Sequence, residues 1–260
     1  MGKNKYGVIM PLHEYNEDYK VLIERAISSV PNNMLFYVIY GGDVNEDFVK
    51  LINNLRSDVV LVNFENTNFS SLINHGMSRV KEDGVEWVYI LEFDDEFNSL
   101  WFDEVSHEIE DKPDVSVFLP LTEIIDYNNN KFISYGNEAP WASSFSSEIG
   151  YIDNESLQQF FDFYLTGSVF NTKDWTYVGG LKESFKLTFW YEFLLRLTHN
   201  DKKAYVIPKL GYKHYVNRPN SLYSKYNDEI NEEEGKWWYD LALEEYAYKK
   251  DRKKEYKKNK

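Results

Sequence analysis

The chain lacks cysteine altogether, and it has no apolar run that approaches the ~20 residues of a membrane-spanning helix. Disulfides, thiol nucleophiles and cysteine-bound zinc are therefore excluded. The segment Met1–Lys5 lacks the long apolar region of a signal peptide. We therefore expect a cytoplasmic protein without a transmembrane segment.

Positive charge is also scarce, since 29 Lys and Arg residues stand against 43 Asp and Glu residues, which gives a net charge of −14. Such a chain is repelled by the phosphate backbone, so nucleic acid is not an expected partner except as a modified-base acceptor. The obvious basic patch is residues 249–260, which reads as a solvated helix extension. With 43% hydrophobic residues, the 260-residue chain can bury a sizeable core.

The first 120 residues alternate between near-continuous apolar runs and amphipathic stretches. This pattern predicts a parallel sheet covered by helices on both faces, with ligands bound beyond the carboxyl ends of the strands. The helical spacing of apolar residues is clear over 19–30, 48–55 and 69–80, and later over 190–197 and from Glu232 onward. The predicted strands are Tyr6–Pro11, Leu35–Tyr40, Val59–Phe64, Trp87–Phe93 and Val115–Leu121.

An acidic cluster, Glu92-Phe93-Asp94-Asp95-Glu96, follows directly on the apolar run Trp87–Ile90. Carboxylates at this spacing repel one another unless they face water or hold a cation, and they suit a hard divalent metal that also carries phosphate. The alternative is an acidic turn on an acidic protein. The position at the carboxyl end of a predicted parallel strand favours the metal–nucleotide interpretation.

Six segments in order resemble the GT-A fold nucleotide-sugar glycosyltransferases, closest to family 2. The resemblance spans residues 6–222. It implies an α/β, Rossmann-like, mostly parallel sheet flanked by helices, with a nucleotide-binding half at 1–122, an acceptor half at 123–222 and a helical C-terminal extension with a basic tail at 223–260. The segments that carry it are Val8–Pro11 with Tyr15-Asn16, Ala26–Val30, Asn74, Tyr89–Glu96, Val178–Glu183 and Tyr215–Ser221.

The resemblance implies metal-dependent, inverting transfer of a sugar from a nucleoside diphosphate sugar, with UDP favoured, to the hydroxyl of a glycan or other acceptor. Manganese or magnesium would stabilise the departing diphosphate. The implied metal-binding segment is Asp94-Asp95-Glu96, with Asp94, Glu96 and His214 as ligands. The residues expected to contact the donor are Pro11, Tyr15, Asp43, Asn74, Asp94 and Arg218.

Two departures from the family pattern bear on function. The second strand ends in Tyr40-Gly41-Gly42, with Asp43 beyond the place of the usual base-binding Asp. The usual catalytic Glu-Asp pair is replaced by Phe189-Trp190.

The expected general base is therefore Glu192, followed by Glu183, although Glu192 is also placed for an ion pair with Arg196 one helical turn away. A nucleotide-sugar-binding protein without catalysis and a nucleotidyltransferase are the alternative functions.

Overall fold

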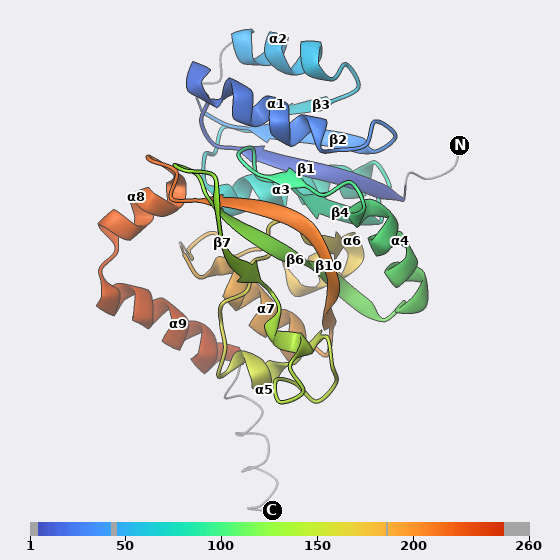
Figure 1. Ribbon diagram of the computed structural model, residues 1–260, viewed down its shortest axis with the longest axis vertical. Coiled ribbons are helices and arrows are strands. Elements are labelled where there is room, and N and C mark those ends of the chain that lie inside the picture. The colour runs from blue at the N-terminus through green and yellow to red at the C-terminus, as the bar shows by residue number, and fades with distance from the viewer. Residues whose placement is uncertain (1–4, 43–45, 186, 247–260) are drawn as a thin grey trace, which may run out of the picture.

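A computed structural model describes residues 5–42, 46–185 and 187–246 of the chain (Figure 1). Its ten strands form one sheet in the order β3-β2-β1-β4-β9-β6-β10-β5, with β7 paired to β6 and β8 paired to β10. The strands are β1 Tyr6–Leu12, β2 Leu35–Tyr40, β3 Val60–Asn63, β4 Trp87–Ile90, β5 Glu96–Phe97, β6 Val115–Asp126, β7 Lys131–Gly136, β8 Tyr151–Ile152, β9 Val169–Asn171 and β10 Lys203–Val216.

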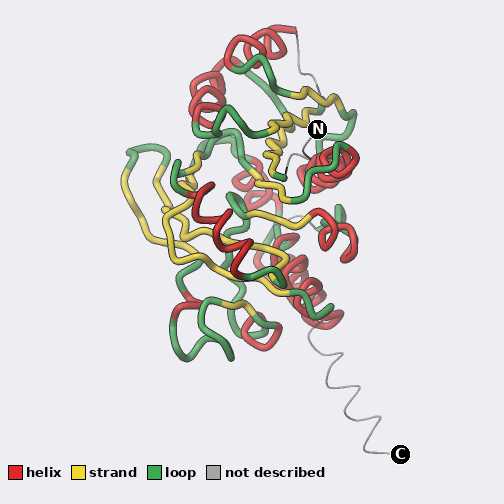
Figure 2. The backbone as a smooth tube through the Cα atoms, turned by 90° about the vertical axis from the view of Figure 1, so that its right-hand side faces the viewer, coloured by secondary structure: helices red, strands yellow, loops and turns green. Residues whose placement is uncertain are grey.

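Helices cover the sheet and connect most of its strands (Figure 2). Two short 3₁₀ helices, η1 at Glu17–Tyr19 and η2 at Ala139–Trp141, accompany them. The α-helices are α1 Lys20–Ser28, α2 Glu46–Leu55, α3 Phe69–Glu82, α4 Trp101–Asp111, α5 Asn154–Leu157, α6 Thr172–Val178, α7 Phe189–His199, α8 Leu222–Glu229 and α9 Glu232–Tyr246.

The N-terminal part of the sheet is parallel, as its apolar runs predict. β1 pairs in parallel with both β2 and β4, and β2 pairs in parallel with β3. Successive side chains of β1 enter opposite layers: Val8 packs with Ile23 of α1 and Phe48 of α2, whereas Ile9 packs with Leu72 of α3. The two-sided burial explains why these strands read as continuous apolar runs.

The remainder of the sheet departs from simple parallel winding. β9, which the sequence did not predict, inserts antiparallel between β4 and β6. β10 is 14 residues long, and it pairs in parallel with β6 with register shifts between Ile207 and Tyr212. Those irregularities bend β10 so that its end returns to the carboxyl end of β4, where β5 pairs with it.

The expected boundary between residues 122 and 123 lies inside β6, so both halves share this strand. The described part of the expected C-terminal extension is helical, and α9 packs on α7, where the rings of Tyr191 and Tyr239 lie 5.3 Å apart. The basic tail lies outside the described residues. Within the described ranges, every helix is too short or too polar to cross a membrane.

Candidate functional site

Three carboxylates gather in the turn after β4. Glu92, Asp94 and Asp95 each offer one oxygen, and these oxygens all lie within 4.8 Å of one another. The turn is short, because β4 ends at Ile90 and β5 already begins at Glu96. Three converging oxygen ligands are the donor set that Mg²⁺ or Mn²⁺ takes, so the cluster fits a single divalent cation.

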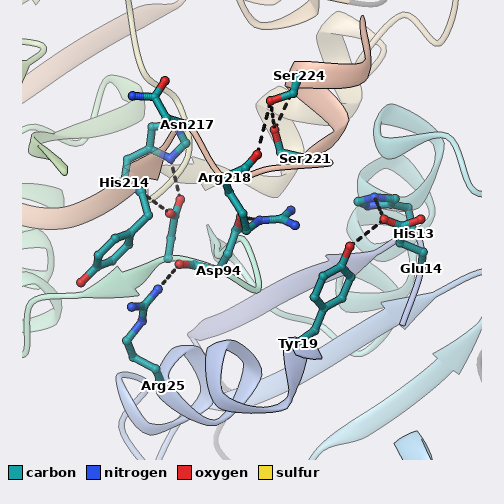
Figure 3. A network of polar contacts seen from close by, with 12 residues as sticks. His13, Glu14, Tyr19, Arg25, Asp94, His214, Asn217, Arg218, Ser221 and Ser224 are labelled. Atoms are coloured by element: carbon teal, nitrogen blue, oxygen red, sulfur yellow. Dashed lines mark hydrogen bonds and ion pairs between the residues drawn. The ribbon is translucent and has the colours of Figure 1, made fainter. Parts of the chain in front are cut away.

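Groups at the end of β10 and just after it hold the cluster from the opposite side (Figure 3). His214 Nδ1 lies 2.8 Å from an Asp95 oxygen, and the Tyr215 amide donates to the other oxygen at 2.8 Å. The Arg218 Nε donates to Asp94 at 2.7 Å. The bend in β10 therefore brings three groups to the acidic turn from residues about 120 positions later in the chain.

A further cation reaches the turn from α1. Arg25 donates to the backbone carbonyl of Asp94, and its guanidinium lies 3.8 Å from the ring centre of Tyr215. Figure 3 shows Arg25 and Arg218 on different sides of Asp94. Both cations are thus placed to offset the negative charge of the turn. Arg218 was among the residues expected to contact the donor, whereas Arg25 was not predicted as a site residue.

Crowding of these groups shifts their proton affinities. Burial, and next the charge of Asp95, raise the pKa of Glu92 to about 8. The same two causes raise the pKa of Asp94, against the lowering effect of Arg218. Burial lowers the pKa of His214, but the charge and hydrogen bond of Asp95 outweigh it and raise that pKa to about 9. A bound cation would relieve the repulsion that raises the carboxyl pKa values.

The structure gathers a different trio from the one expected for the metal. The Glu96 carboxylate turns to Lys213 Nζ, 3.0 Å away, and to the Tyr215 hydroxyl, 3.1 Å away, because Glu96 already belongs to β5 and pairs with Lys213 across the sheet. His214 contacts Asp95 through Nδ1. The spacing that brings carboxylates together is therefore Glu92-Phe93-Asp94-Asp95, two residues earlier than the predicted segment.

A cavity of about 540 Å³ opens at the carboxyl ends of the first strands. It is lined by the loop after β1 (His13–Tyr15), by Gly42 after β2, by the loop before α3 (Asn66–Asn68) and by Leu222 and Tyr226 of α8. The predicted donor residue Tyr15 lies here, next to Phe48 at 5.1 Å between ring centres.

Two contacts join this cavity to the acidic turn. The ring of His13, which lines the cavity, lies 6.2 Å from that of Phe93, which stands between Glu92 and Asp94. Arg218, which binds Asp94, has its guanidinium 5.1 Å from the same Phe93 ring. A ligand with one end in the cavity would therefore extend toward the carboxylates.

A second hollow, of about 420 Å³, lies along the edge strand β3 and the outer face of α3, beside His75 and Arg79. It contains none of the predicted site residues. The cavity next to the acidic turn is therefore the candidate ligand site.

The other predicted donor residues have mixed positions. Pro11 is buried within β1. The Asn74 amide is engaged in a structural contact, since it donates to the Leu181 carbonyl and accepts from the Leu181 amide, both at 2.8 Å. Asp43 lies outside the described residues.

The two predicted bases differ in exposure. Glu192 is fully buried and makes a two-point ion pair with Arg196, with both nitrogen–oxygen distances 2.8 Å, and it also lies 3.3 Å from Lys182 Nζ. Glu183 is exposed. At the start of α7, Phe189 and Trp190 pack on Phe69 and Phe170, which makes this position apolar.

Crystal structures of TarS from S. aureus resemble this chain in fold. Residues 1–349 of TarS in complex with UDP-GlcNAc match with a TM-score of 0.61 and 14% identity, over 85% of this chain and 61% of that one. The complex of the same residues with UDP matches with a TM-score of 0.58 and 15% identity, over 82% and 60%. No protein-family model and no curated protein sequence matches the chain.

At this identity the likeness concerns the fold, and that fold is the one of a GT-A-type glycosyltransferase. The expected fold class is thus confirmed: a curled, mainly parallel sheet flanked by helices. The chain spans about three fifths of residues 1–349 of TarS, 61% in the UDP-GlcNAc complex.

Proposed function

We propose that the chain is a metal-dependent glycosyltransferase that moves a sugar from a nucleoside diphosphate sugar to an acceptor hydroxyl, with inversion. The observation that carries the proposal is the trio Glu92, Asp94 and Asp95 at the carboxyl end of β4, beside a cavity large enough for a nucleoside. The likeness in fold to TarS, crystallised with UDP and UDP-GlcNAc, supports the same class of donor.

The trio would hold Mg²⁺ or Mn²⁺, which supplies a Lewis acid for the negative charge that develops on a leaving diphosphate. Arg218 would add to this stabilisation. Its Nε binds Asp94, while its Nη1 is buried and has no hydrogen-bond partner among the described residues. An unpaired guanidinium nitrogen beside a metal site is suited to a phosphate oxygen.

For the base that activates the acceptor hydroxyl, the two predicted residues now rank differently. A general base must reach the hydroxyl and be free to take its proton. The ion pair of Glu192 with Arg196 opposes both requirements, so we assign this role to Glu183, which is exposed and follows the Gly179-Gly180 turn. The proposed acceptor is the hydroxyl of a glycan or of another compound, as in our sequence-based expectation.

The test combines binding with turnover. Calorimetry should show UDP binding to the purified chain in the presence of Mn²⁺, and loss of that binding with a chelator. Release of UDP from UDP-GlcNAc should then require Mn²⁺ and fall in Glu183→Gln. If the chain binds donors but turns over none of a panel of sugar donors, the proposal of catalysis is refuted, and the chain is a nucleotide-sugar-binding protein.

A matched control is Asp114→Asn, which removes an exposed carboxylate paired with Lys203, far along β10 from the acidic turn. Its Mn²⁺-dependent binding of UDP should equal that of the unmodified chain. Absence of binding for every nucleoside diphosphate, with and without metal, would refute the proposal as a whole.

A further inference from the structure

Most polar groups that line the cavity are already engaged. The Asn66 amide donates to the Ser71 hydroxyl at 3.1 Å and accepts from the Asn68 backbone at 2.9 Å, and the Asn68 side chain accepts from the Ser71 backbone at 3.1 Å. Glu14 accepts from the Tyr19 hydroxyl at 2.9 Å. These contacts cap α3 and fix the loops, so they leave these groups little capacity for a ligand.

The end of β2 offers no side chain to the cavity. A Cβ atom at Gly41 would lie 2.3 Å from the Asn66 carbonyl oxygen, which no side chain tolerates. Gly42 has a φ of +69°, and a Cβ there would lie 3.0 Å from Thr67. Backbone contacts at Gly41 and the positive φ at Gly42 therefore favour glycine, and neither of these two residues presents a side chain to the cavity.

His13, in the loop after β1, has the remaining polar atom. Its side chain is 11% exposed, and its Nε2 is buried with no hydrogen-bond partner among the described residues. A buried polar atom without a partner is costly, and such atoms are rare in folded proteins unless a ligand or water satisfies them.

The surroundings of His13 determine which proton this nitrogen carries. Burial, together with the charges of Lys225 and Arg218, lowers the pKa of His13 against the raising effect of Glu14, so the ring is neutral at pH 7. A Glu14 oxygen lies 3.6 Å from Nε2. A lone pair on Nε2 would face this carboxylate unfavourably, so the tautomer with the proton on Nε2 is favoured. Nε2 is therefore a hydrogen-bond donor whose nearby Glu14 oxygen, at 3.6 Å, lies beyond hydrogen-bond distance.

We propose that His13 determines the base specificity of the donor site by donating from Nε2 to a carbonyl oxygen of the nucleobase. This inference rests on the proposed nucleoside diphosphate site. It selects a base that carries a carbonyl group, such as uracil, over adenine, which has none. The Phe93 contact places His13 at the side of the cavity that meets the acidic turn, as a nucleoside linked to a metal-bound diphosphate requires.

The experiment measures dissociation constants of UDP and ADP by calorimetry with Mn²⁺ for the full chain. The unmodified protein should prefer UDP. His13→Phe keeps an aromatic ring but removes the donor, and it should weaken UDP about 3- to 10-fold, the value of one hydrogen bond, while it leaves ADP nearly unchanged. His13→Gln retains an N–H group and should restore part of the preference.

His75→Phe is the matched control, because His75 stacks on Phe64 at 4.2 Å and does not line this cavity. It should leave both constants unchanged. The inference is overturned if the unmodified protein binds UDP and ADP equally, or if His13→Phe weakens both by the same factor, which would indicate a steric effect. If neither nucleotide binds the unmodified protein, the proposed function fails along with it.

Discussion

The acidic turn after β4 and the start of α7 both contain carboxylates that the sequence predicts to be functional. The carboxylates of the turn crowd together, whereas the one in α7 is paired with a cation. At the turn, three carboxylates converge, and burial together with the charge of Asp95 raises the pKa of Glu92 to about 8. At α7, Glu192 is neutralised completely by Arg196 within a buried ion pair.

The difference shows how to tell a ligand site from a structural one. Carboxylates that crowd together cost free energy in the absence of a cation, and a protein retains them when binding requires them. A carboxylate paired at two points with a guanidinium has no remaining demand for a ligand. Its Arg196 partner also donates to the Gly180 carbonyl at 2.6 Å, so the pair supports the turn that ends α6.

The largest expected effect is on stability, at the structural site. Glu192→Gln leaves the buried Arg196 without its counter-charge, and it should lower the free energy of unfolding by about 3–5 kcal/mol. Denaturant titration measures this loss. The double variant with Arg196→Met should be less destabilised than the sum of the two single variants, because it removes both charges. A loss below about 1 kcal/mol, the range of an exposed ion pair, would contradict the structural role of the Glu192–Arg196 pair.

The next largest effect is on ligand binding, at the acidic turn. Asp94→Asn removes a carboxylate that contacts Arg218 and belongs to the trio, and it should weaken Mn²⁺-dependent binding of UDP by at least about 30-fold, or ~2 kcal/mol. Calorimetry with and without a chelator gives the value. Equal affinity in the variant and the unmodified chain would remove Asp94 from the site.

A smaller effect separates the observed trio from the predicted segment. Glu92→Gln should weaken Mn²⁺ binding by roughly 10-fold, because it removes one of three ligands, while Glu96→Gln should change it by less than about 3-fold. Paramagnetic titration with Mn²⁺ alone measures both without a nucleotide. If Glu96→Gln weakens Mn²⁺ binding more than Glu92→Gln does, the metal-binding segment is Asp94-Asp95-Glu96, as predicted from the sequence.

A separate effect is the dependence of stability on pH that the raised pKa values at the acidic turn predict. The pKa of Glu92 is raised from 4.5 to about 8, so this carboxyl binds its proton more tightly in the folded chain, and its contribution to stability is lost as pH rises from 4.5 to about 8. The pKa of His214 is raised from 6.5 to about 9, so its contribution is present below pH 6.5 and lost as pH rises to about 9.

Without metal, the protein should therefore be more stable at pH 6 than at pH 9. Saturating Mg²⁺ should reverse part of this loss, since it binds the deprotonated carboxylates. Denaturation midpoints at pH 6, 7.5 and 9, with and without Mg²⁺, provide the measurement. A stability that is equal at all three pH values would indicate that the carboxylates of the turn do not interact as described.

Much of the N-terminal sheet could be predicted because its signals are local. The apolar runs at β1, β2 and β4 are buried on both faces, and the helices between them carry stripes of apolar residues at helical spacing. Buried strands and helices of this kind can be recognised from the spacing of apolar residues over a short stretch of sequence. The acidic cluster was found for the same reason, since it follows directly on the apolar run of β4.

The elements that were missed depend on partners far away in the chain. β9 has three residues and is defined by its pairing with β4 and β6, which no local pattern reveals. The sequence-based prediction placed Glu96 among the metal ligands, but Glu96 pairs with Lys213 across the sheet, while Glu92 lies with Asp94 and Asp95.

The sequence by itself determined the α/β class, the absence of cysteine chemistry, and the place of the acidic cluster after a buried strand, because these follow from composition and from contacts among near neighbours. Only the tertiary structure decided which carboxylates converge and that His214 and Arg218 meet them. The physical reason is that the bend of β10 sets these distances, and that bend arises from pairing between strands that are distant in sequence.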